Sequence, residues 1–170
     1  RNITVEALND PPELSGGTTT VEYEEQEPSV NIATGIIVTD VDTSIASASI
    51  TITPYDTNND ILSFTPTAGI TGDLSGGILT LTGPATTANY QDVLESIMYR
   101  NISNTPSTNI RTVTIIVNDG QASNNLSNSS TRNITVEALN DPPELSGGTT
   151  TVEYEEQEPS VNIATGIIVT

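Results

Sequence analysis

The sequence contains no cysteine, histidine, tryptophan or lysine. Without cysteine, a disulfide scaffold and thiolate metal sites are excluded. Without histidine, the chain lacks the commonest general base, and neither a Ser-His-Asp nor a Cys-His nucleophile system can exist. A two-carboxylate glycosidase would need a matched pair of acidic residues in a cleft, and no such pair stands out. The composition therefore predicts that the chain is not an enzyme.

Basic residues of any kind are scarce. The chain carries 22 acidic residues and 4 arginines, which gives a net charge of −18. Such a polyanion repels nucleic acid and anionic lipid and attracts cations. No run of 18 apolar residues occurs, so we expect no membrane span in this window and no nucleic-acid partner.

A long exact repeat is the most informative feature that is present. Residues 1–39 (RNITVEALNDPPELSGGTTTVEYEEQEPSVNIATGIIVT) are identical to residues 132–170, an offset of 131 residues. This period exceeds the roughly 20–50 residues of small solenoid units and suits an array of whole domains. We expect residues 1–8 to be the last strand of a preceding repeat. Residues 9–139 would form a complete repeat, and residues 140–170 the first strands of the next, identical one. Any targeting signal is expected outside this window.

Alternation of polar and apolar residues predicts β-strands along most of the period. Turn signals separate these stretches, among them the tripeptide NDG at 118–120. The predicted strands are 1–8, 18–24, 30–39, 46–55, 61–65, 77–82, 97–102, 111–118 and 132–139.

One stretch has a helical spacing instead. Tyr90, Val93, Leu94 and Ile97 lie at positions i, i+3, i+4 and i+7, with Thr87 as the expected N-cap. The expected fold class is therefore all-β, an antiparallel β-sandwich with one short helical crossover. Its larger core side chains are predicted to be Phe64, Tyr90, Met98 and Tyr99.

Three segments together resemble the cadherin-like tandem repeats of extracellular adhesins and surface fibre proteins. The first is ALNDPPEL at 7–14 and again at 138–145, similar to an Asn-Asp-x-Pro linker between repeats. The second is TDVD at 39–42, and the third is the order of elements in residues 88–120, from the helix to the NDG turn. The resemblance implies Ig/cadherin-like β-sandwich repeats in tandem, located outside the cell or at its surface.

The resemblance also implies calcium at the junctions between repeats, since calcium takes about 6–8 oxygen ligands from carboxylates and carbonyls. Two positions, Ala7 and Pro11, depart from the family pattern. We therefore expect each junction to hold one calcium ion or none, and not several ions. A stiff linker is expected with or without calcium, because consecutive prolines favour extended geometry. The matching positions are Asn9, Asp10, Glu25 (or its neighbour Glu24), Asp40, Asp42, Asp119, Asn140 and Asp141.

N-linked glycans are the second accessory that the sequence suggests. The triplet Asn-x-Ser/Thr makes a residue a potential acceptor if the protein is secreted through a glycosylating pathway. Two of the triplets fall in the polar stretch 124–131 (NNLSNSST), which is expected to be an accessible loop. The candidate acceptors are Asn2, Asn101, Asn125, Asn128 and Asn133.

An exact repeat allows a long molecule to be built from identical units, because each unit buries its own core and contacts only its neighbours. The predicted function is that of a structural extracellular protein, a segment of a fibre or adhesin stalk whose main partner is itself. Head-to-tail units could be covalently joined, form a polymer, or donate the strand at 1–8 to a neighbouring subunit. The alternative is a cell-surface module that binds a carbohydrate or a partner repeat, although few aromatics are available for stacking on sugars.

Overall fold

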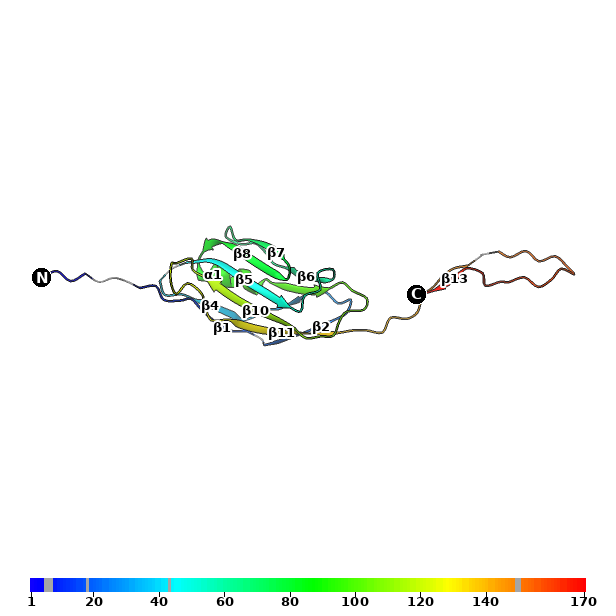
Figure 1. Ribbon diagram of the computed structural model, residues 1–170, viewed down its shortest axis with the longest axis horizontal. Helices are drawn as coiled ribbons and strands as arrows, with labels where there is room; N and C mark the ends of the chain where they lie inside the picture. Colours follow the sequence, from blue (N-terminus) through cyan, green and yellow to red (C-terminus); the bar gives the residue numbers. More distant parts are fainter. Residues whose placement is uncertain (5–7, 18, 43, 149–150) are drawn as a thin grey trace. The chain divides into compact units, whose positions relative to one another are not determined.

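The computed structural model of the protein describes residues 1–4, 8–17, 19–42, 44–148 and 151–170. It divides into two units, Arg1–Leu139 and Asn140–Thr170. The first unit contains most of the strands and the helix, as Figure 1 shows. The described residues are all-β apart from this one helix, which confirms the predicted class.

A six-stranded sheet forms the larger part of the first unit. All neighbouring strands in it are antiparallel except β2 and β11, which are parallel. This pair departs from the antiparallel arrangement that the sequence predicts. Parallel pairing is possible because a long connection separates the two strands. In spatial order the sheet consists of β2 (Thr20–Glu24), β11 (Ser130–Glu137), β10 (Arg111–Asn118), β5 (Ile45–Thr53), β8 (Ile78–Ala85) and β7 (Thr71–Ser75).

Two smaller sheets and the helix complete the unit. Helix α1 (Thr87–Glu95) connects β8 of the larger sheet to β9 of the three-stranded sheet, as the predicted crossover requires. The three-stranded sheet has the order β3 (Val30–Asn31), β9 (Met98–Asn101) and β6 (Asp60–Ser63). The remaining antiparallel pair is β1 (Glu13–Gly16) with β4 (Ile36–Thr39).

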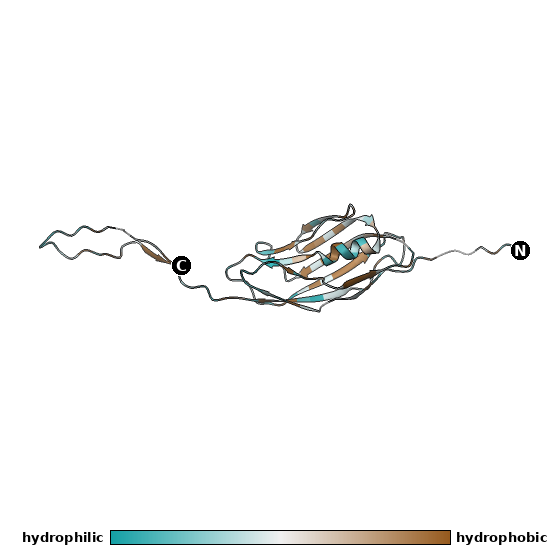
Figure 2. Ribbon diagram, turned by 180° about the vertical axis from the view of Figure 1, so that it is seen from behind, coloured by the Kyte–Doolittle hydropathy of each residue, from teal (hydrophilic) through white to brown (hydrophobic). Residues whose placement is uncertain are grey.

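One hydrophobic cluster joins these elements. Alternate residues of β5 and β10 are buried, and so are the apolar residues of α1, which explains the periodicities visible in the sequence. Figure 2 shows the corresponding hydrophobic bands on the strands. Tyr90 and Tyr99 belong to this core as predicted, whereas Phe64 is only partly buried against it and Met98 is half-buried. Tyr23 is an additional core residue.

The helix begins one residue earlier than the sequence suggests. Thr86, rather than Thr87, is the N-cap, and its side-chain oxygen accepts a hydrogen bond from the backbone amide of Asn89. Thr86 has extended backbone angles, which an N-cap residue requires. The cap therefore lies directly after β8, and the predicted apolar face at Tyr90, Val93 and Leu94 is buried.

The stretch 30–39, predicted as one strand, forms two separate strands. The side chain of Asn31 accepts a hydrogen bond from the amide of Ala33, and the amide of Ile36 bonds to the carbonyl of Ala33. Gly35 has a φ of 73°, which favours glycine. These turn contacts direct β3 to the three-stranded sheet and β4 to its pairing with β1.

Identical sequences adopt different structures at 1–4 and 132–135. Residues 130–137 form β11 between β2 and β10, whereas residues 1–4 belong to no strand and residues 5–7 lie outside the described part. The strand predicted at 1–8 is therefore not formed over residues 1–4. Flanking strands supply the hydrogen-bond partners that an isolated strand lacks.

The second unit repeats only the start of the first. Its strands β12 (Leu145–Gly147) and β13 (Ile167–Val169) pair in the same register as the identical residues of β1 and β4. Their apolar side chains are exposed.

The turn after β1 has a close packing contact that a single substitution tests. Gly17 has a φ of 82°, and a Cβ atom there would overlap with the guanidinium of Arg132. We expect Gly17→Ala to lower the free energy of unfolding by about 1–3 kcal/mol, because it adds backbone strain as well as the clash. Urea denaturation measures this. Gly148→Ala is the control at the identical position of the second unit, where no arginine is close, and an equal loss of stability in both variants would contradict the expectation.

Candidate functional site

Five of the predicted site residues gather at one end of the first unit, which we call the amino-terminal pole: Asn9, Asp10, Asp40, Asp42 and Asp119. The side-chain amide of Asn9 donates to the Asp119 carboxylate at 2.8 Å and to two backbone carbonyls of the 123–124 segment. The backbone amide of Asp10 donates to the Asp42 carboxylate at 2.7 Å. The amide of Asp42 in turn donates to Asp40 at 2.9 Å. The structure thus ties the linker to the ends of β4 and β10.

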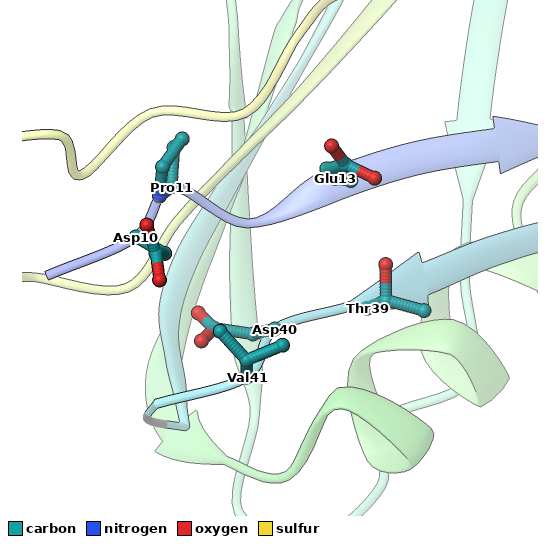
Figure 3. A pocket seen from close by; sticks show the side chains of 6 residues that line it. All are labelled: Asp10, Pro11, Glu13, Thr39, Asp40 and Val41. Carbon is teal, nitrogen blue, oxygen red and sulfur yellow. The ribbon is translucent and has the colours of Figure 1, made fainter.

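A cavity of about 320 Å³ opens beside these residues. Figure 3 shows it between the linker, at Asp10 and Pro11, and the end of β4, at Thr39 and Asp40. Glu13 and Val41 complete its lining. Its carboxylates would favour cations over anions.

The opposite end, which we call the carboxyl-terminal pole, is formed by Glu25, Glu137 and Leu139. The amide of Glu25 donates to the carbonyl of Glu137 at 2.9 Å. The side chain of Glu25 is buried, and its Oε2 accepts from the amide of Leu139 at 2.8 Å. Its Oε1 is buried and has no hydrogen-bond partner among the described residues. Glu25 therefore holds the chain where it leaves β11.

The remaining two candidates, Asn140 and Asp141, belong to the second unit, where the Asn140 amide donates to the carbonyl of Asp141. Within the described residues, no three or more acidic side chains converge in an arrangement that could hold a metal ion. The donor chemistry at the two poles is nevertheless that of hard cations, since it consists of carboxylate and amide oxygens. The sequence repeats the linker at 138–145 but contains only one copy of the Asp-x-Asp segment. The calcium site stays a prediction.

The predicted glycan acceptors lie in different surroundings. Asn133 on β11 is exposed, as is Asn2. The side chain of Asn101 is buried, and its amide nitrogen donates to Asp60 at 2.7 Å. Asn128 bonds both backbone groups of Leu14 at 2.8 Å, and Asn125 donates to Asn118 at 3.3 Å. Glycosylation at these residues stays a prediction, and Asn2, Asn128 and Asn133 are the exposed ones.

Sequence reasoning missed a buried polar cluster around Asp60. Its carboxylate accepts from the Tyr99 hydroxyl at 2.6 Å, from the Asn101 amide, and from Nε of Arg111 at 3.2 Å. The backbone amide of Asp56 adds a further bond at 2.9 Å. Arg111 also donates to two backbone carbonyls of the 107–109 segment. Each member of the cluster is hydrogen-bonded within it, so the cluster joins β6, β9 and β10. The Asp60 carboxylate is occupied by these hydrogen bonds.

Two buried tyrosines make the stability of the fold sensitive to alkaline pH. Burial raises the pKa of Tyr90 from 10.0 to about 12. Burial, followed by the hydrogen bond to Asp60, also raises the pKa of Tyr99. The folded state holds these protons more tightly than the unfolded chain does. The resulting stability is complete below pH 10 and is lost as pH rises through the raised pKa values.

We therefore expect the free energy of unfolding to fall steeply between about pH 10 and pH 12. Equilibrium unfolding at a series of pH values measures this. Tyr90→Phe removes one of the titrating groups, so the decline should be shallower in that variant. An unchanged pH dependence in Tyr90→Phe would show that Tyr90 does not contribute.

The chain matches no known protein-family profile, and no curated protein matches it either. Among the described residues, no helix is long and apolar enough to cross a membrane.

Proposed function

We propose that the chain is a segment of an extracellular fibre or adhesin stalk, built of identical cadherin-like β-sandwich repeats joined head to tail. The exact repeat at 1–39 and 132–170 supports this proposal. So does the single core shared by the six-stranded sheet, the smaller sheets and α1. In this proposal the chain has no catalytic role and associates mainly with copies of itself.

One observation carries the proposal: identical residues are buried in the first unit and exposed in the second. Leu14 is 5% exposed, whereas its copy Leu145 is 73% exposed. Tyr23 is 1% exposed, and its copy Tyr154 is 60% exposed. In the first unit these side chains are covered by strands from residues 40–139. Residues 140–170 contain no counterpart of that segment.

The end of the period shows the same asymmetry. Ile134 on β11 is fully buried, while the identical Ile3 is 90% exposed. Ile3 would be buried if a preceding unit supplied strands equivalent to β2 and β10. Both differences in burial fit one period of 131 residues in which each unit needs all its strands.

The buried tyrosines favour this structural role over the carbohydrate-binding alternative. Tyr23, Tyr90 and Tyr99 are all in the core. Sugar recognition commonly uses exposed aromatic rings, which offer an apolar face with a polar tip. Tyr55 is partly buried against the core as well.

The test is to append a second copy of residues 40–139 after Thr170, so that both units are complete. Amide hydrogen exchange then compares residues 145–169 in the longer chain and in the 170-residue chain. We expect these amides to become as protected as residues 14–38. Amides that stay unprotected in the longer chain would contradict the tandem-repeat proposal.

Calcium at the junctions is part of the proposal. Asp10, Asp40 and Asp42 would supply oxygens from the amino-terminal pole of one unit, and Glu25 of the preceding unit would supply its unpartnered Oε1. The longer chain should unfold at a higher midpoint temperature in calcium than in a chelator, because a ligand that binds only the folded state stabilises it. Asp141→Ala, at the copy of Asp10 in the second unit, or alanine at the copy of Asp40 in the added segment should abolish the shift, while Asp73→Ala, on the exposed strand β7, should leave it intact. Identical midpoint temperatures of unfolding in calcium and in chelator would contradict calcium binding at the junction.

Glycans are the second accessory in the proposal. After secretion from a glycosylating host, we expect peptide mass spectrometry to find Asn133 modified in preference to Asn101. The buried amide of Asn101 is bonded to Asp60, so a glycan there would break that contact. Modification of Asn101 at the same level as Asn133 in the folded protein would contradict this expectation.

A further inference from the structure

The first unit begins and ends on neighbouring parallel strands. The chain enters along β1 and β2, and it leaves along β11. Strands β2 and β11 pair in parallel over five residues, from Thr20 opposite Asn133 to Glu24 opposite Glu137. Figure 1 shows the two strands side by side at one border of the unit. The first and last parts of the unit are therefore bonded directly to each other.

Hydrogen bonds outside the ladder extend this pairing at both ends. The Arg132 guanidinium donates to the carbonyl of Gly16 at 3.0 Å, and the amide of Asn133 donates to the carbonyl of Thr19 at 2.8 Å. At the far end, Glu25 bonds to β11 through its backbone amide and to the exit of β11 through its carboxylate. The contact thus runs from the turn after β1 to the exit of the chain.

Strand β1 is fastened separately. The side-chain amide of Asn128 accepts from the backbone amide of Leu14 and donates to its carbonyl, both at 2.8 Å. On its other side β1 forms the antiparallel ladder with β4. Asn128 lies in the connection from β10 to β11, so this bond again links the start of the unit to its last part.

The direction of these strands decides how they respond to tension. Asn9 is held beside Asp119, at the end of the unit where β10 finishes and β11 begins. Leu139 lies at the opposite end, beyond the finish of β11. Pulling Asn9 and Leu139 apart therefore draws β2 and β11 in opposite senses along their axes. Every bond between them is loaded at once, in shear, instead of opening one after another.

We propose that β2 and β11, with their flanking side-chain bonds, are a mechanical clamp that carries tension through the unit. The load passes from Asn9 through β1 and β2 into β11 without crossing the sheet through β5, β8 and β7. This inference rests on the proposed function, because tension reaches Asn9 and Leu139 only in a chain of linked units.

Single-molecule force spectroscopy on the full chain tests the clamp, and the absence of cysteine allows unique attachment points. Leu8→Cys with Asn140→Cys loads β2 against β11 in shear. Ile110→Cys with Asn140→Cys is the control: β10 begins at the end where β11 finishes, so this pair peels the two antiparallel strands apart. Since forced unfolding follows the unfolding barrier, we expect a severalfold higher force in the shear geometry. Equal forces in the two geometries would overturn the proposal.

Two proline variants locate the resistance within β2. Thr19 and Glu25 direct their backbone groups to β11, so by the alternation of a strand Val21 does so too, while Glu22 faces the open edge of the sheet. Proline is tolerated where the lost N–H faces outward from an edge strand. Val21→Pro should lower the shear force more than Glu22→Pro does. An equal reduction would count against the clamp, and if Val21→Pro does not fold, the two pulling geometries decide alone.

The force measurement is independent of the repeat architecture, because it uses one unit. A high shear force combined with unprotected residues 145–169 in the longer chain would keep the clamp and refute the tandem array. Equal forces combined with full protection would refute the clamp and keep the array.

Discussion

Replacing Asp60 by alanine is expected to lower the free energy of unfolding by about 3–5 kcal/mol, because removing one partner of a buried ion pair leaves the other charge uncompensated. Arg111 is nearly fully buried and would lose its only ion-pair partner among the described residues. The Tyr99 hydroxyl and the Asn101 amide would lose their acceptor as well. Urea denaturation followed by circular dichroism measures the loss.

Two further variants test whether the loss of stability comes from the buried cluster or simply from removing a negative charge. Asp73→Ala removes an exposed carboxylate on β7 and should change the free energy of unfolding by no more than about 0.5 kcal/mol. Asp60→Ala combined with Arg111→Ala should cost less than the sum of the two single substitutions, because the partners are coupled. Strict additivity would show that Asp60 and Arg111 do not stabilise the fold as a pair.

The parts of the fold that the sequence predicts are those with a local periodicity. Residues 111–118 form a strand with the predicted bounds, because alternate residues are buried and the pattern repeats every second position. The helical spacing at Tyr90, Val93 and Leu94 likewise identifies α1. In both cases the spacing of apolar residues within the element itself predicts which of its faces is buried.

The features that the sequence does not predict depend on contacts between distant residues. The parallel pairing of β2 with β11 joins residues more than 100 positions apart, and nothing in either strand specifies its neighbour. Asp60 precedes a short apolar stretch and looks like an ordinary loop carboxylate. Only the assembled sheets place Tyr99 and Arg111 against it.

The candidate site shows the same division. The linker and the Asp-x-Asp segment could be singled out because their turn-forming and acidic residues are local signals. That Asn9 contacts Asp119, and that Asp10 contacts Asp42, depends on where the ends of β4 and β10 lie in the fold. The unpartnered oxygen of Glu25 has no local signal, because burial rather than residue type distinguishes it from its neighbour Glu24.

Because the sequence repeats, the same substitution can be made at two identical positions, Leu14 and Leu145, and its effects on stability can be compared. Leu14→Ala should lower the free energy of unfolding by about 2–5 kcal/mol, the range for deleting a buried leucine side chain. Leu145→Ala changes the same residue in the same local sequence, and the two leucines pair with equivalent valines, Val38 and Val169. Because Leu145 is exposed, its replacement should change the free energy of unfolding by no more than about 0.5 kcal/mol.

The longer chain with two complete units turns this comparison into a test of the repeat. There, the copy of residues 40–139 should cover Leu145, and Leu145→Ala should become as costly as Leu14→Ala. Strand pairing is the same in both chains, so burial alone would account for the change. An equal cost of the two substitutions already in the 170-residue chain would mean that Leu145 is covered without a complete second unit. The incomplete repeat would then not need the missing strands, and the argument for a head-to-tail array would lose its main support.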